Sequence, residues 1–462
     1  MWNFSRKKKY TFKGGAHVTE YKNTRHIPIE RMPAPPTVAV PLSQHIGAPC
    51  RPLVSPGDHV DYGQIIGDTD GLGCPVHASV SGKVLKIAKV TSSTGAPVDA
   101  VVLENDGLYT LCPDVKPFPK PLEEATPDEL VELIRNAGIA GMGGATFPTY
   151  AKLKSAIGRA DTLIINSAEC EPFITANHRM MLEHPRRIVV GTGILMHALG
   201  LDHAIIAVED NKPDAIELLK KHAANAKGVE IVTMKTKYPQ GDERQIIYAL
   251  TGKELPAGKL PADLGCVLFN AETVAAIWHA FTFGTPLCKR VVTIDGDCVA
   301  RPSNIKVPIG TSYRDLLAHC GGLVKQPAKI INGGPMMGFA QWDLDGVVTK
   351  GTSAVLVLSE EFCKKNKCLS EPSCIRCGRC VAHCPMHLTP NMLVSYAKQR
   401  RFDDAAAAHA MSCVECGTCA YHCPAGIPLV QHIRVAKNAI RMAQMAARAK
   451  ETEKKGEEKH GN

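Results

Sequence analysis

The pattern of apolar and polar positions changes several times along the chain. Residues 1 to about 35 predict an extended arm, and Pro33, Pro35 and Pro36 exclude regular structure at its end. From Val38 to Asn105, short apolar runs alternate with turns that contain glycine and proline, so this segment predicts a β-rich module. A proline-rich linker, from Pro113 to Pro121, closes it.

Apolar strands and helical segments alternate from Thr126 onward. The segment 126–129 has a capping threonine, a proline at the first helical position and two acids in the first turn, so a helix begins there. Apolar runs at 161–166, 203–208 and 228–234 predict buried strands, and Asp214 to Ala224 predicts a helix between the last two. This alternation predicts a parallel, doubly wound sheet.

The pattern changes again after this region. A second β-rich segment runs from Arg290 to about Leu358, and an alanine-rich helical stretch covers Leu393 to Met411. The charged end, Ala449 to Asn462, is poor in apolar residues and is predicted to be disordered. Just before it, apolar residues recur at three- and four-residue steps: Leu429, Ile433, Ala436 and Ile440. This stripe either docks a partner or packs on the chain's own last domain.

Two cysteine runs carry the most specific chemistry. The first is Cys374, Cys377, Cys380 and Cys384 before Pro385, and the second is Cys413, Cys416, Cys419 and Cys423 before Pro424. Both read C-x-x-C-x-x-C-x-x-x-C-P, the spacing in which three thiolates wrap one [4Fe–4S] cluster and the fourth reaches the neighbouring cluster. The predicted sites are therefore Cys374, Cys377, Cys380 and Cys423 for one cluster, and Cys413, Cys416, Cys419 and Cys384 for the other.

Zinc and disulfides are poorer interpretations of these runs. Structural zinc sites use separated pairs of ligands, and disulfide frameworks belong to secreted proteins. The other ten of the 18 cysteines, Cys50 and Cys112 among them, have no metal spacing and are expected to be small buried hydrophobic residues.

Composition sets broader limits. The 462 residues are 45% hydrophobic, which is typical of a globular protein with several domains. No apolar stretch is long enough for a bilayer span, and no apolar segment follows the basic N-terminus, so we expect a cytoplasmic chain without a signal peptide. The net charge of +9 is spread out and aromatic residues are only 5%, so nucleic acid is not an expected partner. An acidic protein or an anionic membrane surface explains the charge as well.

A glycine-rich loop at 138–149 precedes a helical stretch that contains Lys152. Glycines let backbone amides approach an anionic group closely, but a plain structural turn explains the loop equally well. Polar residues also end apolar strands at 166–172, 238–243 and 269–273. Ligands of α/β proteins bind at such strand ends, although each segment taken alone is explained by ordinary capping.

Together these four segments resemble the flavin- and NADH-binding subunit of respiratory complex I. That family reads G-R-G-G-A-G-F-P-T, N-A-D-E-x-E-P, Y-x-x-G-E-E and V-N-N-V-E-T in this order. The resemblance implies that FMN is cradled by Gly141, Gly143, Gly144, Lys152, Asn166, Asn270 and Thr273. It places Glu169 and Glu171 with the cofactor, and Phe147 and Glu243 with NADH.

Three positions depart from that pattern. Met142 replaces an arginine, Ala168 an aspartate and Asp242 a glutamate. The lost arginine and aspartate favour an alternative, a flavin-free relay with two clusters whose α/β domain only docks redox partners. The retained glycines, Lys152 and Asn270 oppose it.

The N-terminal half carries a further resemblance. Lys13 to His17, Pro28 to Glu30 and Pro41 to Gly47 are similar to the C subunit of the Rnf (Rsx) ion-translocating electron-transport complex, and the order of parts is similar over residues 10–435. The region at 56–64 also resembles a biotinyl/lipoyl hammerhead. Since no lysine lies between Asp68 and Val76, we expect a structural module and no swinging arm.

The expected fold class is a multidomain α/β and β protein, with a Rossmann-like flavin/NADH domain, barrel-sandwich and β-grasp-like modules and a helical two-cluster ferredoxin domain. The expected parts are an arm (1–35), a barrel-sandwich domain (36–112), an FMN/NADH-binding domain (122–285), a β-grasp-like SLBB domain (290–358), a ferredoxin-like domain (363–435) and a charged tail (436–462).

The resemblance implies a peripheral subunit on the cytoplasmic face of the inner membrane. It would pass electrons between NADH, FMN and two [4Fe–4S] clusters. Its expected partners are membrane subunits of the same complex and a ferredoxin-like donor or acceptor. We expect docking through the basic arm from Arg6 to Lys13 and through the apolar stripe.

Overall fold

The computed structural model describes residues 10–365 and 372–460, which form two compact units. Among these residues, the first unit comprises 10–11, 18–236 and 240–362. The second unit comprises 12–17, 237–239, 363–365 and 372–460. Two short segments from far upstream in the sequence therefore belong to the C-terminal, cysteine-bearing unit.

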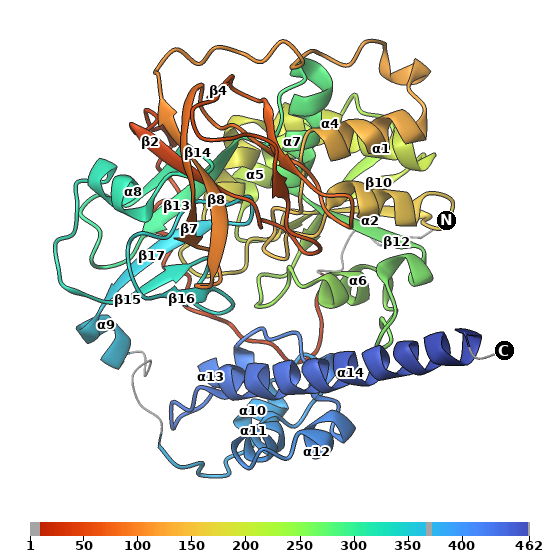
Figure 1. The fold of residues 1–462 in the computed structure, drawn as a ribbon. Coiled ribbons are helices and arrows are strands. Elements are labelled where there is room, and N and C mark those ends of the chain that lie inside the picture. The colour runs from red at the N-terminus through yellow and green to blue at the C-terminus, as the bar shows by residue number, and fades with distance from the viewer. Residues whose placement is uncertain (1–9, 366–371, 461–462) are drawn as a thin grey trace. The chain divides into compact units, whose positions relative to one another are not determined.

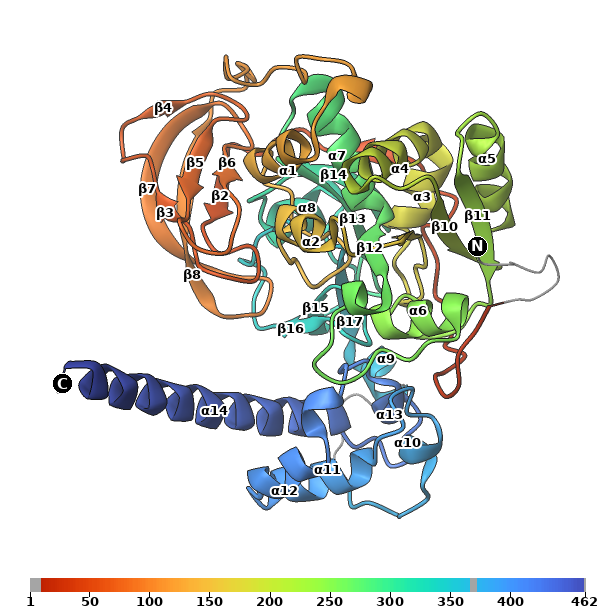
Figure 2. The same cartoon turned by 90° about the vertical axis from the view of Figure 1, so that its right-hand side faces the viewer.

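The first unit begins with two antiparallel sheets, drawn in red and orange in Figures 1 and 2. One has the order β2-β8-β7-β4 and the other β3-β5-β6. The strands are β2 (Thr37–Pro41), β3 (Arg51–Pro52), β4 (His59–Val60), β5 (Ile65–Asp68), β6 (Val76–His77), β7 (Gly82–Thr91) and β8 (Pro97–Asn105). Alternate residues of these strands, such as Val38 and Val40, are buried and share one core with the α/β region that follows.

A parallel four-stranded sheet with the order β11-β10-β9-β12 forms the centre of the first unit. Its elements in chain order are α1 (Pro127–Asn136), α2 (Thr149–Ala156), β9 (Thr162–Asn166), α3 (Ala176–Glu183), α4 (Pro185–Leu199), β10 (Ala204–Glu209), α5 (Pro213–Ala223), β11 (Val229–Met234), α6 (Glu243–Thr251), β12 (Cys266–Asn270) and α7 (Ala271–Phe283), with 3-10 turns η1 (Leu122–Glu124) and η2 (Pro261–Leu264). The predicted helix start is confirmed, since Thr126 and Glu129 form a reciprocal capping box.

Both faces of this sheet are covered. Leu163 and Ile165 of β9 pack into the core shared with α4 and α7, whereas Ile164 packs into a second core with Ile246 and Ile247 of α6. Because neighbouring strand residues point to opposite faces, an uninterrupted apolar strand needs cover on both sides. The doubly wound parallel sheet predicted from the alternation of strands and helices is confirmed.

A six-stranded sheet follows, with the order β1-β14-β13-β17-β15-β16. It consists of β1 (Ile29–Arg31), β13 (Lys289–Asp295), β14 (Ser303–Pro308), β15 (Pro327–Asn332), β16 (Phe339–Gln341) and β17 (Ala354–Ser359), with α8 (Tyr313–His319) beside it and α9 (Glu360–Lys365) after it. β1 comes from the segment predicted as an arm and pairs in parallel with β14. Nearby, Lys22 donates to the carbonyl oxygens of Glu169 and Glu171, so this part of the arm is built into the first unit.

The second unit is helical. It contains α10 (Arg379–Ala382), α11 (Pro390–Lys398), α12 (Phe402–Ala407), η3 (Ala410–Ser412), α13 (Thr418–Tyr421) and α14 (Leu429–His460). α11, α12 and α13 all contact α14, drawn in dark blue in Figure 1. The predicted helical stretch from Leu393 to Met411 is interrupted between α11 and α12, where Arg400 takes a left-handed conformation with φ 57°.

Two expectations for the C-terminal end are wrong. The stripe Leu429, Ile433, Ala436 and Ile440 is at most 5% exposed and packs in the core of its own unit, so it is not a docking surface. The stretch from Ala449, predicted to be disordered, continues α14 to His460. The reason is helix propensity, because lysine and glutamate make up most of this stretch and both favour a helix. Residues 461–462 lie outside the described residues.

None of the helices within residues 10–365 and 372–460 combines the length and the apolarity that a bilayer crossing requires.

Candidate cofactor sites

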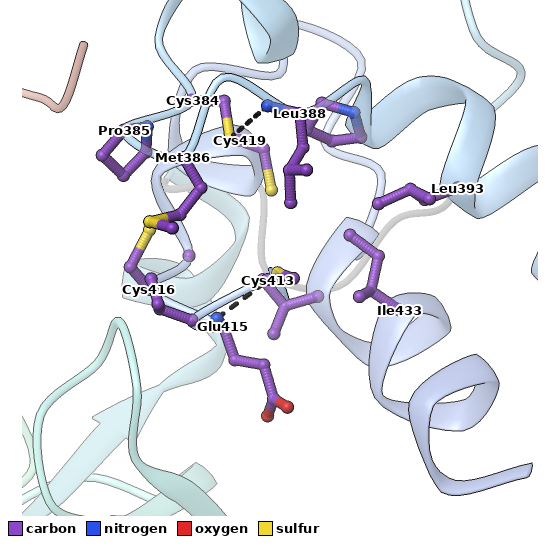
Figure 3. A pocket seen from close by; sticks show the side chains of 14 residues that line it. Cys384, Pro385, Met386, Leu388, Leu393, Cys413, Glu415, Cys416, Cys419 and Ile433 are labelled. Atoms are coloured by element: carbon purple, nitrogen blue, oxygen red, sulfur yellow. Dashed lines mark hydrogen bonds between the residues drawn. The ribbon is translucent and has the colours of Figure 1, made fainter. Parts of the chain in front are cut away.

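Four cysteines from both runs line one cavity in the second unit. Cys384 of the first run lies there with Cys413, Cys416 and Cys419 of the second, around a volume of about 20 Å³ (Figure 3). The remaining walls are mostly apolar and include Leu388, Leu393 and Ile433. This is the set that the crossed pattern predicts for one cluster, and an apolar wall keeps water from the sulfurs.

Backbone amides point at the sulfurs of this cavity. The Leu388 amide donates to Cys384 Sγ and the Glu415 amide to Cys413 Sγ, both at 3.4 Å. Burial raises the pKa of the Cys416 thiol to about 12. A bare thiolate is therefore unfavourable here, whereas iron would supply the positive charge that a buried thiolate needs. The donor set thus fits a soft, cationic iron–sulfur cluster.

The two cysteine loops repeat the same backbone geometry. Arg376 of the first run and Glu415 of the second both have positive φ, 56° and 58°. Each amide donates to the Sγ of the first cysteine in its run at 3.4 Å. A glycine with positive φ, Gly378 or Gly417, then caps a short helix in each loop. The sequence duplication is therefore also a structural duplication.

The other predicted set is arranged differently. Cys374 and Cys377 are exposed, Cys380 and Cys423 are half-buried, and the last two pack against the core of this unit. No group of three or more His, Cys, Asp or Glu side chains in residues 10–365 and 372–460 is placed to hold a single metal ion.

Two upstream segments hold the cysteine loops in place. The carbonyl of His383 accepts from the amide of Gly15 at 2.9 Å. Gly14 has φ +73°, and a Cβ atom there would lie 2.8 Å from the carbonyl oxygen of Cys384, so glycine is required. Tyr238 pairs with Ala16 through two backbone hydrogen bonds of 2.8 Å. Sequence reasoning missed this anchoring role, although a Gly-Gly pair in an extended segment signals a close backbone approach.

The histidines that precede the fourth cysteines stack on each other. The rings of His383 and His422 have centroids 3.6 Å apart and planes inclined by 25°. His383 Nδ1 lies 2.9 Å from the carbonyl oxygen of Arg379. Burial, and then the neighbouring His383, lower the pKa of His422. The pair therefore packs between the two loops.

The glycine-rich loop lies at the carboxyl edge of the parallel sheet. Asn166 and Asn270, which end β9 and β12, stand opposite each other in the strand register. A Cβ on Gly143 would lie 3.4 Å from Asn270 Cβ, and the Met142 amide donates to Thr273 Oγ1 at 2.9 Å. Five of the predicted FMN residues, Gly141, Gly143, Gly144, Asn270 and Thr273, are thus on or beside this loop.

The loop is closed at its base and open at its tip. Gly141 donates to the carbonyl of Phe147 at 2.9 Å, so the two residues fix the ends of a tight turn. Gly144 has φ +111°, and a Cβ there would meet nothing within 4 Å. The tip therefore has space above it and exposes glycine backbone, which suits the approach of a phosphate or a flat ring.

Lys152 and Glu243 meet at the same sheet edge. Lys152 Nζ lies 2.5 Å from Glu243 Oε1 and 3.0 Å from the carbonyl oxygen of Leu268. Glu243 opens α6, and Asn166 Nδ2 donates to the carbonyl of Gly241 at 2.8 Å, just before it. The structure therefore gathers residues from four separate segments at one place.

The two glutamates predicted with the cofactor make other contacts. Glu169 is buried, and its carboxylate accepts from the Asn177 amide at 2.7 Å, at the start of α3. Glu171 accepts from the amides of Met336 and Met337 at 3.1 and 2.9 Å. Both carboxylates have backbone partners, so their placement with FMN stays a prediction.

The departures from the complex I pattern are accommodated locally. Met142 is buried at 4% exposure, and Asp242 caps α6 by accepting from the amides of Arg244 and Gln245. The amide of Ala168 donates to Asn166 Oδ1 at 3.1 Å. The backbone course of the three segments is therefore fixed without the arginine and the aspartate.

Four families match successive parts of the chain. They are the RnfC barrel sandwich hybrid domain at residues 10–108, the Nuo51 FMN-binding domain at 134–279, the SLBB domain at 291–340 and the 4Fe-4S dicluster domain at 373–427. The last match covers both cysteine runs, and the second covers the glycine-rich loop and the ends of β9 and β12. Together they define an iron–sulfur flavoprotein of the electron-transport class.

Full-length relatives make the assignment specific. The chain is 45% identical over 434 residues to the C subunit of the Na⁺-translocating ferredoxin:NAD⁺ oxidoreductase complex of Acetobacterium woodii, over 93% of this chain and 97% of that protein. It is 44% identical over 444 residues to the C subunit of the proton-translocating ferredoxin:NAD⁺ oxidoreductase complex of Clostridium ljungdahlii, over 95% and 96%. The chain belongs to the family of C subunits of ion-translocating oxidoreductase complexes. The two relatives are named for different ions although they match this chain almost equally.

A solved structure of an NAD⁺-reducing [NiFe]-hydrogenase in the H₂-reduced state is also similar, with 20% sequence identity and a TM-score of 0.49. The similarity covers 69% of this chain and 63% of that chain.

Proposed function

We propose that this chain is the peripheral electron-transfer subunit of a membrane-bound, ion-translocating oxidoreductase. It would relay electrons between NADH and two iron–sulfur clusters in a complex that couples NAD⁺ and ferredoxin chemistry to ion transport. The observation that carries this proposal is the pair of sites on one chain. One is a glycine-rich loop at the edge of a parallel sheet, and the other is a duplicated cysteine module.

The cluster ligands are assigned as a crossed pair of sets. Cys413, Cys416, Cys419 and Cys384 hold one [4Fe–4S] cluster, and the cavity that these four residues line supports this set. Cys374, Cys377, Cys380 and Cys423 hold the other, which rests on the matching geometry of the two loops. Amides that donate to sulfur stabilise the extra charge of a reduced cluster and so set its potential.

The flavin site is assigned to the loop and the strand ends around it. Gly141, Gly143 and Gly144 admit the cofactor to the backbone, and Asn166, Asn270 and Thr273 fix the loop and the sheet edge. Lys152 supplies a positive charge for the phosphate, and in this structure the same side chain forms an ion pair with Glu243. Glu169 and Glu171 complete the flavin surroundings, and Phe147 and Glu243 face NADH.

FMN, when bound, accepts an electron pair and releases single electrons, which iron–sulfur clusters carry. The protein's own residues bind, orient and shield these groups, and no general acid–base pair is required. We propose the domain bounds that were expected from the sequence, with one change. The helical core of the ferredoxin-like domain extends to Ile440.

We propose attachment to the cytoplasmic face of the membrane through partner subunits. The relatives' place in a membrane complex supports this, together with the absence of a bilayer-crossing helix among the described residues. The basic arm from Arg6 to Lys13 remains the proposed docking segment, although Arg6 to Lys9 lie outside the described residues. The buried stripe on α14 is excluded from this role.

The visible spectrum of the anaerobically reconstituted chain tests the redox assignment. We expect flavin absorbance together with about eight iron and eight sulfide per chain, and bleaching of both chromophores by NADH. Iron without flavin would support the flavin-free relay that the lost arginine and aspartate suggested. Zinc in place of iron would reject the cluster assignment altogether.

Sedimentation of membranes from cells that lack the partner subunits tests the attachment. The chain should then stay in the supernatant, and it should return to the membrane fraction when the partners are restored. If it pellets without them, its attachment is direct, through lipid.

A further inference from the structure

A second cavity, of about 100 Å³, lies in the first unit and has no part in the proposed electron relay. Its charged side chains come from α4, α7, β13 and β14, which are labelled in Figure 2. A water molecule needs roughly 10–15 Å³ measured in this way, so the cavity has room for several waters or for one small ligand.

The lining of this cavity is strongly cationic. Arg187, Lys289, Arg290 and Lys306 line it, against one carboxylate, that of Glu272. Arg290 pairs with Glu272 at 3.2 Å. Within the described residues, the other three cations have no ion pair, so the cavity carries three uncompensated positive charges.

Two of these three cations rest on aromatic rings. Arg187 lies 5.5 Å from the ring centroid of Trp278, and Lys289 lies 4.7 Å from that of Tyr109. Ring faces hold the cations in place without neutralising them. The charged groups are therefore positioned and still able to bind an anion.

The cations repel one another. Burial and then repulsion by Arg187, Arg31 and Lys289 lower the pKa of Lys306 to about 8. Burial followed by Arg187 and Lys306 lowers the pKa of His279 to about 3. A cluster of like charges that is partly withdrawn from water, as these half-buried side chains are, is costly unless a counterion accompanies it.

Two buried nitrogen atoms without hydrogen-bond partners among the described residues also indicate that a ligand is missing from this cavity. The side chain of Arg290 is fully buried and uses Nε for the carbonyl oxygen of Thr352, at 3.2 Å. Its Nη1 has no hydrogen-bond partner in the part of the chain that the structure describes, and neither has Nε2 of His279, another lining residue. Buried guanidinium nitrogens are rarely left unpaired, because an unmade hydrogen bond to a charged group costs free energy.

We propose that this cavity binds a small oxyanion with two or more negative charges, held by Arg187, Lys289, Lys306 and Arg290. Guanidinium groups match the paired oxygens of phosphates and carboxylates, and the lysines add point charges. Such a ligand would supply the missing counter-charge and an acceptor for Arg290. It would bind next to the glycine-rich loop, because Met142 of that loop also lines the cavity.

Thermal unfolding of the full chain, titrated with pyrophosphate and separately with citrate, tests this proposal. Sodium chloride at equal ionic strength serves as the reference. We expect a saturable rise in Tm with at least one probe, beyond any effect of chloride. A rise in Tm with pyrophosphate alone indicates a phosphate ligand, and a rise with citrate alone indicates a polycarboxylate. A rise with both probes indicates a general oxyanion site. No saturable rise with either probe overturns the proposal.

Variants locate the site. Lys289→Met and Lys306→Met should each weaken probe binding at least about tenfold, since each removes a charge-assisted contact. Lys86→Met, at an exposed lysine of β7, should leave binding unchanged. Lys306→Met should also raise the Tm of the ligand-free chain, because it relieves repulsion. The proposal is contradicted if all three variants weaken probe binding equally. It is also contradicted if Lys306→Met lowers the Tm of the ligand-free chain and leaves probe binding unchanged.

Discussion

The hydroxyl of Tyr238 donates a 2.6 Å hydrogen bond to the carbonyl oxygen of Cys416, 178 positions further along the chain. Tyr238 is only 1% exposed, and Cys416 is one of the four cysteines that line the cluster cavity. A residue of the sheet-end segment at 238–243 therefore supports a cluster loop in the same compact unit.

Tyr238→Phe should destabilise the second unit by about 1–3 kcal/mol, because a buried carbonyl loses its donor. The temperature at which cluster absorbance disappears, measured anaerobically, reports the loss. Tyr421→Phe is the matched control, since Tyr421 is 45% exposed in the same unit and should change this temperature little. Equal effects of the two variants would show that the Tyr238 hydroxyl contributes nothing specific.

Crossed ligation makes a prediction about pairs of cysteines. Cys384→Ser should damage the same cluster as Cys413→Ser, so the double variant should lose no more iron than Cys413→Ser alone, about half of the total. Cys384→Ser combined with Cys374→Ser should lose both clusters. Iron analysis and electron paramagnetic resonance of the reduced protein distinguish the cases. Greater loss in the first double variant than in Cys413→Ser would indicate uncrossed ligation.

Gly143→Leu should remove most of the flavin, because the side chain would fill the space between the loop and Asn270. Gly143→Ala should retain more flavin, since its Cβ would sit at an ordinary contact distance of 3.4 Å. Flavin released by acid and read by fluorescence measures the occupancy. Unchanged iron content controls for folding, and full flavin occupancy in Gly143→Leu would place the flavin elsewhere.

The buried carboxyl group of Asp295 is predicted to make the free energy of unfolding depend on pH. It is fully buried, one of its oxygens has no hydrogen-bond partner in the described part of the chain, and burial raises its pKa to about 6. In the native state it holds a proton that the unfolded chain releases at lower pH. Its contribution to stability therefore falls as pH rises from its ordinary pKa toward 6.

Asp295→Asn should remove this term. Relative to the wild type, the variant should gain about 1 kcal/mol between pH 5 and pH 7.5 in unfolding experiments on the first unit. Asp202→Asn, at an exposed position, should follow the wild type across the same range. A constant difference between Asp295→Asn and the wild type at both pH values would show that Asp295 stays charged in the native state.

Alanine substitutions at neighbouring positions of α14 should destabilise the second unit to very different extents. Ile433 is fully buried and Val435 is 58% exposed. Ile433→Ala should destabilise the second unit by about 2–5 kcal/mol, and Val435→Ala by no more than about 0.5 kcal/mol. Thermal loss of cluster absorbance measures both. A stable Ile433→Ala variant that no longer joins the membrane would instead return the stripe to a docking role.

The sequence alone predicted features that depend on short spacing. The two cysteine runs, the capped helix start at Thr126 and the apolar strand at 161–166 follow from local rules, because the residues involved lie within one loop, one helical turn or one strand. The apolar stripe was visible in the same way, but the sequence did not reveal which residues pack against it. Periodicity marks a buried face without naming what buries it.

Contacts between distant segments were decided only by the tertiary structure. Gly14 approaches Cys384, Tyr238 reaches Cys416, and Arg187 meets Lys306 through elements that are separate in sequence. The cationic cavity is therefore invisible in the sequence, where its four basic residues are scattered and look like ordinary surface charges. The spacing of ligands is a local property of the chain, whereas burial and charge compensation depend on which elements pack together.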